Sequence, residues 1–309
     1  MSAHRERALA ALELKRWDEL VRQAREGLAV DPEDAHLHAL LSVGLLRGPT
    51  PAEAVPPARA AVALAPDDPW ILQVAAEALS HSRKRGEALR MTERAVAIAP
   101  EDAVNHVHLA AQLVDSAAKT QWTRRKRKLL GRAEVHAQRA MALDPSDPGG
   151  FIAMANVCLH RADADWARYY GNEALRRDPQ HPSGHQVMGL AAEQDGDLRA
   201  ASDHYVSAAR LTPDDTSSLR FLRKMRRSWP VNGIVIYLIV RYLIVGGRAV
   251  SGAAAGAIFV LAAVVAVTAV VWPRVAARRA MSHTARSALT VDRQTRRSRR
   301  VRDRRRAHR

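Results

Sequence analysis

One four-residue phrase recurs along the chain and constrains the fold more than any other feature. It carries proline in second place, usually followed by acidic residues, and it begins at Asp31, Ala65, Ala99, Asp144, Asp178 and Thr212. Successive prolines are 34, 34, 45, 34 and 34 residues apart. A fixed period of this length indicates stacked supersecondary units that bury their apolar faces against one another. The longer interval predicts an insertion in the fourth unit.

Small side chains recur at fixed places in this period. When each proline is set at position 32, position 8 holds Ala8, Ser42, Ala76, Ala110, Ala155 and Gly189. Position 20 holds Leu20, Ala54, Ala88, Ala133, Ala167 and Ala201. Position 27 holds Gly27, Ala61, Ala95, Ala140, Ala174 and Ala208. Two helices that cross closely need small residues where they touch, so each unit is predicted to be a helix–turn–helix.

This pattern resembles the tetratricopeptide repeat, a helix–turn–helix unit of 34 residues. The resemblance implies an all-α solenoid of about six repeats over residues 1–215, with a basic insertion at residues 119–128. In the second repeat, Pro56 and Pro57 predict a second helix that begins late. Residues 216–228 are expected to form a capping helix and basic linker.

A membrane region is predicted at residues 229–273. From Ala249 to Trp272 there are 24 residues without a charge, and about 20 suffice to cross a ~30 Å hydrocarbon core. Residues 231–245 form a shorter apolar stretch that contains Arg241. Inside a membrane an arginine at mid-span costs roughly 2.5 to 3.5 kcal/mol. The transmembrane helix is therefore expected at 249–272, and a short helix at 231–245.

Three topologies remain open for this region. A two-span hairpin keeps both basic flanks, residues 220–227 and the tail at 274–309, on the cytoplasmic side, where such residues are retained. A single span, or a segment inserted in one leaflet, is the alternative. No secretory signal peptide is visible at the N-terminus. We expect a cell-membrane protein, hairpin-anchored or multi-pass, with the repeats and the tail in the cytoplasm.

The net charge of +16 is concentrated in a few segments. The tail at 274–309 holds 14 arginines and two aspartates, so it is expected to be disordered and to bind the anionic inner leaflet. Nucleic acid is the alternative ligand of the tail, although the tail has no aromatic residue to stack on bases. The high alanine and arginine content suggests a GC-rich bacterial genome.

The insertion is the second basic segment. It is predicted either to extend the two helices of repeat 4 into solvent, to contact anionic lipid or nucleic acid, or to meet a protein partner. The candidate contact residues are Trp122, Arg124, Arg125, Lys126, Arg127 and Lys128.

The family resemblance implies a groove on the first helices that binds a protein or peptide. Positions 2, 5, 9, 12 and 13 would face it, although ordinary solvated helix surface is the alternative for each residue. The candidates are His36, Val43, Arg47, Trp70, Gln73, Glu77, His81, Asn156, His160, Gln186 and Glu193. The Lys, Asn and Arg clamp of the family members that bind chaperone tails is missing, so that specificity is not expected.

No catalytic motif is found, and we expect neither an enzyme nor a cofactor or metal site. The sole cysteine, Cys158, is predicted to be a small core residue.

The predicted function is a membrane-anchored adaptor or scaffold that presents its groove to cytoplasmic partners. The alternative is a membrane-tethered nucleic-acid-binding protein that uses the tail and the insertion. Gly252 and Gly256 offer a surface for homo-oligomer formation through close helix packing.

Overall fold

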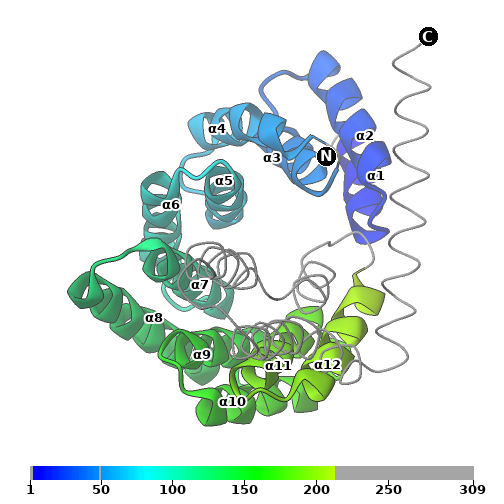
Figure 1. Ribbon diagram of the computed structural model, residues 1–309. Helices are drawn as coiled ribbons and strands as arrows, with labels where there is room; N and C mark the ends of the chain where they lie inside the picture. Colours follow the sequence, from blue (N-terminus) through cyan, green and yellow to red (C-terminus); the bar gives the residue numbers. More distant parts are fainter. Residues whose placement is uncertain (1–2, 49, 213–309) are drawn as a thin grey trace, which may run out of the picture. The chain divides into compact units, whose positions relative to one another are not determined.

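The computed structural model describes residues 3–48 and 50–212 (Figure 1). The predicted capping helix, the membrane segments, Gly252, Gly256 and the basic tail lie outside these residues. The chain divides into two compact units, with the boundary between Val187 and Met188. In the described part, every regular element is a helix, and no helix there is both long and apolar enough to cross a membrane.

The described helices form six consecutive pairs, as the 34-residue period predicts. The first helices of the pairs are α1 (Ala3–Glu13), α3 (Ala35–Arg47), α5 (Pro69–His81), α7 (Ala103–Lys119), α9 (Pro148–His160) and α11 (Pro182–Gln194). The second helices are α2 (Trp17–Val30), α4 (Val55–Leu64), α6 (Arg85–Ile98), α8 (Thr123–Leu143), α10 (Ala164–Arg177) and α12 (Leu198–Leu211). A 3-10 turn, η1 (Pro51–Ala54), precedes α4, so the second helix of repeat 2 begins late because prolines occupy its start.

Within the first unit, the helices stack in two layers. Each of the first helices α1, α3, α5 and α7 packs against the first helix of the next repeat. The second helices α2, α4, α6 and α8 each pack against the following first helix. The first helices therefore share one continuous face, on which side chains from several repeats lie next to one another.

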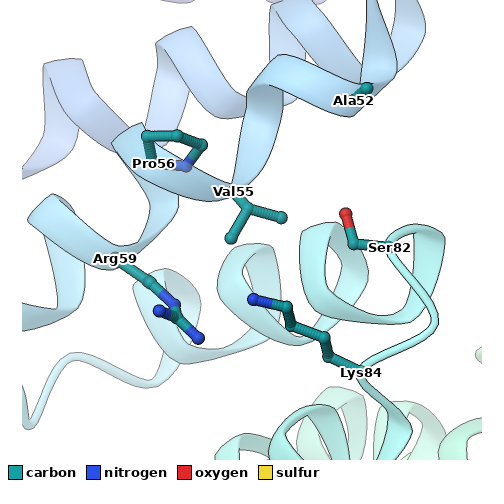
Figure 2. A pocket seen from close by; sticks show the side chains of 6 residues that line it. All are labelled: Ala52, Val55, Pro56, Arg59, Ser82 and Lys84. Atoms are coloured by element: carbon teal, nitrogen blue, oxygen red, sulfur yellow. The ribbon is translucent and has the colours of Figure 1, made fainter.

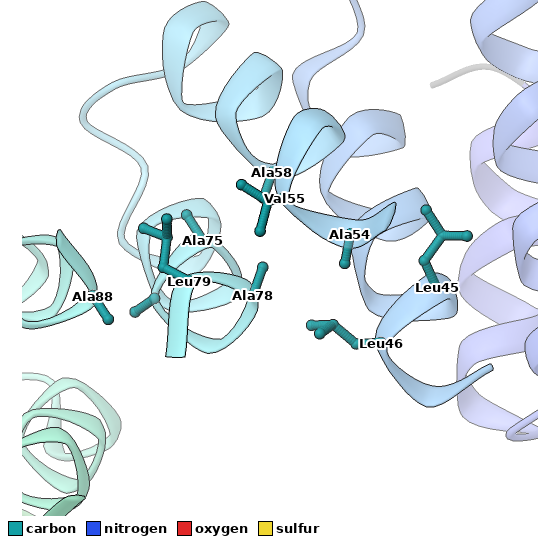
Figure 3. Packing of buried hydrophobic residues seen from close by; sticks show 10 residues of the cluster. Leu45, Leu46, Ala54, Val55, Ala58, Ala75, Ala78, Leu79 and Ala88 are labelled. Atoms are coloured by element: carbon teal, nitrogen blue, oxygen red, sulfur yellow. The ribbon is translucent and has the colours of Figure 1, made fainter. Parts of the chain in front are cut away.

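The small residues occupy the helix crossings. The alanines at positions 8, 20 and 27 are all buried, with exposed fractions between 0 and 2%. Between repeats 2 and 3, Figure 3 shows Ala54 and Ala58 of the η1–α4 segment facing Ala75, Ala78 and Leu79 of α5. Because these alanines are almost fully buried, a larger side chain in their place would overpack the helix crossing.

An acidic residue after the repeat-ending proline caps the next first helix. The carboxylates of Asp34, Asp68, Asp102 and Asp147 accept hydrogen bonds from backbone N–H groups in the first turns of α3, α5, α7 and α9. Each carboxylate satisfies a donor that has no partner within the helix and faces its positive end. The recurring four-residue motif thus ends one helix with its proline and caps the next helix with its acidic residue.

In the second unit, Gly189 on α11 allows close approach of Tyr205 on α12. A Cβ at Gly189 would lie only 2.5 Å from Cε1 of Tyr205, which is fully buried. The Tyr205 hydroxyl donates to Oε2 of Glu193 at 3.1 Å. Burial raises the pKa of Tyr205, so the phenol keeps its proton in this bond. Glycine at position 8 and tyrosine at the facing position are therefore a matched pair.

Candidate functional site

A small cleft opens on the shared face of the first helices in repeats 1 to 3. It encloses about 180 Å³ and is lined by Arg5 and Leu9 of α1, His36 and Leu40 of α3, and Trp70 of α5. Three successive repeats thus contribute to one cleft. The leucines and the indole supply an apolar wall, and Arg5 and His36 supply the polar edge.

The cleft brings together two of the predicted groove residues, His36 and Trp70. Their rings stack with centroids 5.7 Å apart and an angle of 15° between the planes. The Nε2 atom of His36 lies 3.3 Å from Oδ2 of Asp68, the cap of α5. Trp70 also packs on the apolar clusters between α1, α3 and α5, where Val43 lies. The indole is therefore held in one orientation before any ligand arrives.

Farther along the same helices, the predicted groove residues are tied to other side chains. Arg47 and Glu77 form an ion pair at 2.6 Å between α3 and α5. Gln73 is 9% exposed, and its amide donates to Asn105 Oδ1. Gln73 is thus buried rather than exposed in the groove, because Asn105 of the next repeat accepts its hydrogen bond. His81, at the end of α5, is exposed.

The remaining predicted groove residues lie on α9 and α11. Asn156 and His160 are half-buried on α9, and the His160 ring bonds to the Asn156 carbonyl at 3.1 Å. Gln186 lies on α11 within the first unit, whereas Glu193 lies in the second unit, where it accepts the bond from Tyr205. Within the first unit, Asn156, His160 and Gln186 are not among the residues that line the cleft around Trp70.

A wider, shallower hollow of about 480 Å³ lies beside α4 and the α5–α6 turn. Figure 2 shows the side chains of Arg59 and Lys84 reaching toward this hollow beside Val55. Arg59 pairs with Glu87 at 2.5 Å. None of the predicted groove residues lines this hollow.

A recurring histidine was not singled out by the sequence patterns above. At position 4 of three repeats, a histidine Nε2 bonds to the carbonyl of the preceding repeat-ending proline: His38 to Pro32, His106 to Pro100 and His185 to Pro179, at 2.9 to 3.1 Å. Because a carbonyl only accepts, Nε2 must carry the proton in each bond. These histidines link consecutive repeats, and their recurrence at one position of the period is the signal that could have identified them.

His106 also meets a second histidine. Its Nδ1 lies 2.9 Å from Nδ1 of His136 on α8, and the rings stack at 5.2 Å. With the proton of His106 on Nε2, its Nδ1 accepts from His136. Burial, reinforced by His106 and Arg132, lowers the pKa of His136, whereas Glu93 opposes this shift. The neutral form of His136 is thus favoured in the folded protein.

The remaining chemistry-bearing residues of the described part form no reactive cluster. Cys158 is 7% exposed, and burial raises the pKa of its thiol to about 11. The thiolate that would act as a nucleophile is therefore scarce near neutral pH. Among residues 3–48 and 50–212, no three His, Cys, Asp or Glu side chains are placed to hold a metal ion.

The basic insertion lies at the tip of the longest helix pair. Helices α7 and α8 have 17 and 21 residues, compared with 13 and 14 for α5 and α6. The extra turns contain the predicted contact residues, with Trp122 in the connection between the helices. Trp122 is 76% exposed.

Comparison with solved structures identifies the architecture. A thermophilic tetratricopeptide-repeat protein from Thermus thermophilus matches with a TM-score of 0.54 and 19% identity, covering 60% of this chain and 94% of that one. PilW, a widely conserved type IV pilus biogenesis factor, matches with a TM-score of 0.52 and 15% identity, covering 71% of this chain and 96% of its own. The chain has a tetratricopeptide-repeat fold. No protein-family model and no curated protein matches the sequence.

Proposed function

We propose that this chain is a membrane-anchored adaptor that holds a protein partner in the cleft around Trp70. The observation that carries the proposal is the convergence of three first helices on one apolar cleft whose aromatic wall is already oriented. The tetratricopeptide-repeat fold is suited to this task, because stacked repeats expose an extended surface built from successive helices.

The chemistry of the cleft favours an extended peptide segment with an apolar side chain. Leu9 and Trp70 offer an apolar surface that such a side chain would desolvate, with the fully buried Leu40 behind them. Aromatic residues in well-packed pockets are frequent binding hot spots. At the cleft, the His36–Asp68 contact supplies a donor and an acceptor for the peptide backbone, and the Arg47–Glu77 pair supplies others farther along the same helices. The volume fits one side chain better than a large cofactor.

The membrane part of the proposal rests on the sequence. The uncharged stretch at 249–272 is long enough to span a bilayer, and a second crossing at 231–245 would leave both basic flanks, residues 220–227 and 274–309, on the cytoplasmic side that they favour. In this arrangement the repeats and the tail at 274–309 are cytoplasmic, and the anchor keeps the cleft close to the inner leaflet.

Site-specific photo-crosslinking in cells tests the partner site. A photoreactive amino acid at Leu9 should form an adduct with a protein partner, and Trp70→Ala should reduce the yield at least tenfold. The matched control carries the same photoreactive amino acid at Ala63, an exposed position on α4. Equal adducts from both positions, or an adduct at Leu9 that is insensitive to Trp70→Ala, would contradict the site.

Reporter fusions test the topology separately. Junctions after Ser228, Arg248 and Arg309 should report the outside only at Arg248 if the region forms a hairpin. An outside signal at Ser228 would place the repeats in the exterior space and overturn the cytoplasmic adaptor.

A further inference from the structure

The tip of the α7–α8 pair projects beyond the turns of the neighbouring repeats. Compared with α5, α7 has four additional residues, and compared with α6, α8 has seven; at 1.5 Å per residue these add about 6 and 10 Å of helix. On either side, the ion pairs Arg85–Asp115 and Arg161–Glu134 tie the base of this projection to the adjacent repeats. The tip is therefore a firmly based extension rather than a loose loop.

Six cations lie on this tip without a carboxylate partner. From residue 116 to residue 133 the chain contains no Asp or Glu. The six are Lys119, Arg124, Arg125, Lys126, Arg127 and Lys128; Lys126 is half-buried and the others are exposed. None of them forms an ion pair with any residue of the described chain.

Elsewhere on the second helices and η1, three ion pairs recur at the same two positions of the repeat. Positions 25 and 19 of consecutive repeats carry opposite charges, which meet as Arg25–Glu53, Arg59–Glu87 and Glu93–Arg132. The order of the charges is reversed in the last of these, and the pair still forms. Three pairs of consecutive repeats thus match a cation with a carboxylate at these positions, whereas the six cations of the tip have no such partner in the described part of the chain.

The local sequence of the tip is unfavourable for the start of helix α8. Helix α8 begins without a side-chain cap at Trp122 and has no acidic residue in its first turn. Its first six residues include Arg124, Arg125, Lys126, Arg127 and Lys128, which lie at the positive end of the helix dipole. Such a start is unfavourable for an isolated helix, and an anion bound at the tip would relieve it. A segment that breaks local rules without an internal compensation is a marker of function.

We propose that this tip, residues 119–128, docks on the headgroups of anionic phospholipids. Each cation near an anionic bilayer contributes about 1 kcal/mol, that is, about a fivefold gain in binding. Trp122 is the exposed indole in the middle of the cluster, and tryptophan favours the boundary between headgroups and acyl chains. The rest of residues 1–219 carries more acidic than basic side chains, so an anionic bilayer repels the body and attracts the tip.

Lipid fits the tip better than a nucleic-acid strand does. Binding of single strands combines a basic groove with several aromatic platforms for successive bases. The tip supplies one aromatic side chain, on a narrow end of two helices. A planar array of phosphates requires no groove, and the single indole serves as an anchor.

This inference rests on the proposed membrane attachment, and it adds a second contact that would fix the orientation of the repeats. Full-length protein carrying Gln121→Cys is labelled at that cysteine with an environment-sensitive fluorophore. The native Cys158 is buried, with its pKa raised to about 11, so it should react poorly with the label. The protein is placed with nanodiscs of phosphatidylcholine alone or of phosphatidylcholine mixed with phosphatidylglycerol.

The label should shift to the blue with anionic discs and not with neutral ones. Salt at about 1 M, where the Debye length is about 3 Å, should reverse the shift. The triple variant Arg124→Gln, Arg125→Gln, Arg127→Gln should lower the affinity of the tip for anionic discs by about a hundredfold, at about fivefold per cation. The matched control, Arg7→Gln, Lys84→Gln, Arg90→Gln, removes the same charge from other exposed positions and should keep the shift.

The outcomes separate the two proposals. Co-elution with neutral discs reports the anchor, whereas the shift on anionic discs reports the tip, even if neutral discs retain no protein. The tip proposal is overturned by an unchanged label on anionic discs, by equal loss in the control triple, or by a shift that only a single-stranded oligonucleotide produces.

Discussion

Repeats 3 and 4 have the same core and different ends. Both place buried alanines at positions 8, 20 and 27, and both begin with an aspartate cap, Asp68 or Asp102. Both repeats turn within three residues, but repeat 4 lengthens both helices before and after the turn and carries the basic tip. The difference teaches that packing specifies the helix crossings, whereas the helix ends beside the turn can vary in length.

The two repeats also differ inside. At positions 4 and 23, repeat 3 has Leu72 and Met91, and repeat 4 has His106 and His136. The apolar pair is insensitive to pH, whereas the histidine pair requires a particular arrangement of protons. Equivalent positions in the two repeats thus hold an apolar pair in repeat 3 and a titratable pair in repeat 4.

The largest effect should come from overfilling a helix crossing. Ala88→Leu in repeat 3 and Ala133→Leu in repeat 4 each insert three carbons where the exposed fraction is 0%. Overpacking costs about 1 to 3 kcal/mol or more, and we expect similar losses in both repeats. Urea unfolding followed by circular dichroism measures the loss of unfolding free energy. Ala97→Leu and Ala142→Leu, on exposed faces, should cost far less; equal costs would refute the shared-core comparison.

Removing a cap should have the next largest effect. Asp102→Ala should destabilise the protein by about 1 kcal/mol, a usual value for an N-cap. Asp68→Ala should cost more, because Asp68 accepts from the N–H groups of both Trp70 and Ile71. The control is Asp67→Ala, which removes only a surface pair with Arg94 and should cost less than about 1 kcal/mol. A larger loss from Asp67 than from Asp68 would show that the caps are not the source of stability.

Lowering the pH should have a smaller effect on stability than removing a cap, and the effect should arise in repeat 4. The pKa of His136 is lowered in the folded protein, so the unfolded chain takes up a proton first as the pH falls below 6.5. Its contribution to stability is therefore present above that pH and is lost as the pH falls through the folded pKa. Because His136 is only half-buried, its contribution to the unfolding free energy should be small.

The matched test replaces the pair with the residues of repeat 3. The double variant His106→Leu, His136→Met should show a shallower loss of unfolding free energy between pH 7 and pH 5 than the unmodified protein. Parallel curves for the two proteins would show that the histidine pair does not govern the acid response.

The smallest effect on stability should come from the tip. Arg124→Gln, Arg125→Gln and Arg127→Gln together should change the unfolding free energy by less than about 0.5 kcal/mol per residue, and toward stability, because they remove cations from a positive helix end. Thermal unfolding in low salt measures this. A loss as large as that of Ala133→Leu would mean that the tip is part of the core.

Much of the fold follows from the spacing of residues. The prolines predict where each repeat ends, and Ala54, Ala88 and Ala133 predict where its helices cross. Pro56 and Pro57 predict the late start of α4. These features are local or periodic, so they can be read along the chain without knowledge of the contacts.

The site was predicted less completely. The positions that face the first-helix surface include His36 and Trp70, and applying the same register to repeat 1 would have included Arg5 and Leu9. The burial of Gln73 depends on Asn105, 32 residues away. The contact between His106 and His136 likewise joins two helices across a turn, so spacing along the chain does not reveal it.

The sequence by itself determined the period, the all-α class and the small residues at the crossings, because each is imposed by helix geometry within one repeat. Only the tertiary structure decided that Leu9, His36 and Trp70 share a cleft, that histidines join consecutive repeats, and that the cations of the insertion have no carboxylate within reach in the described part of the chain. These properties arise between repeats, where side chains from distant positions compete for the same space and the same hydrogen bonds.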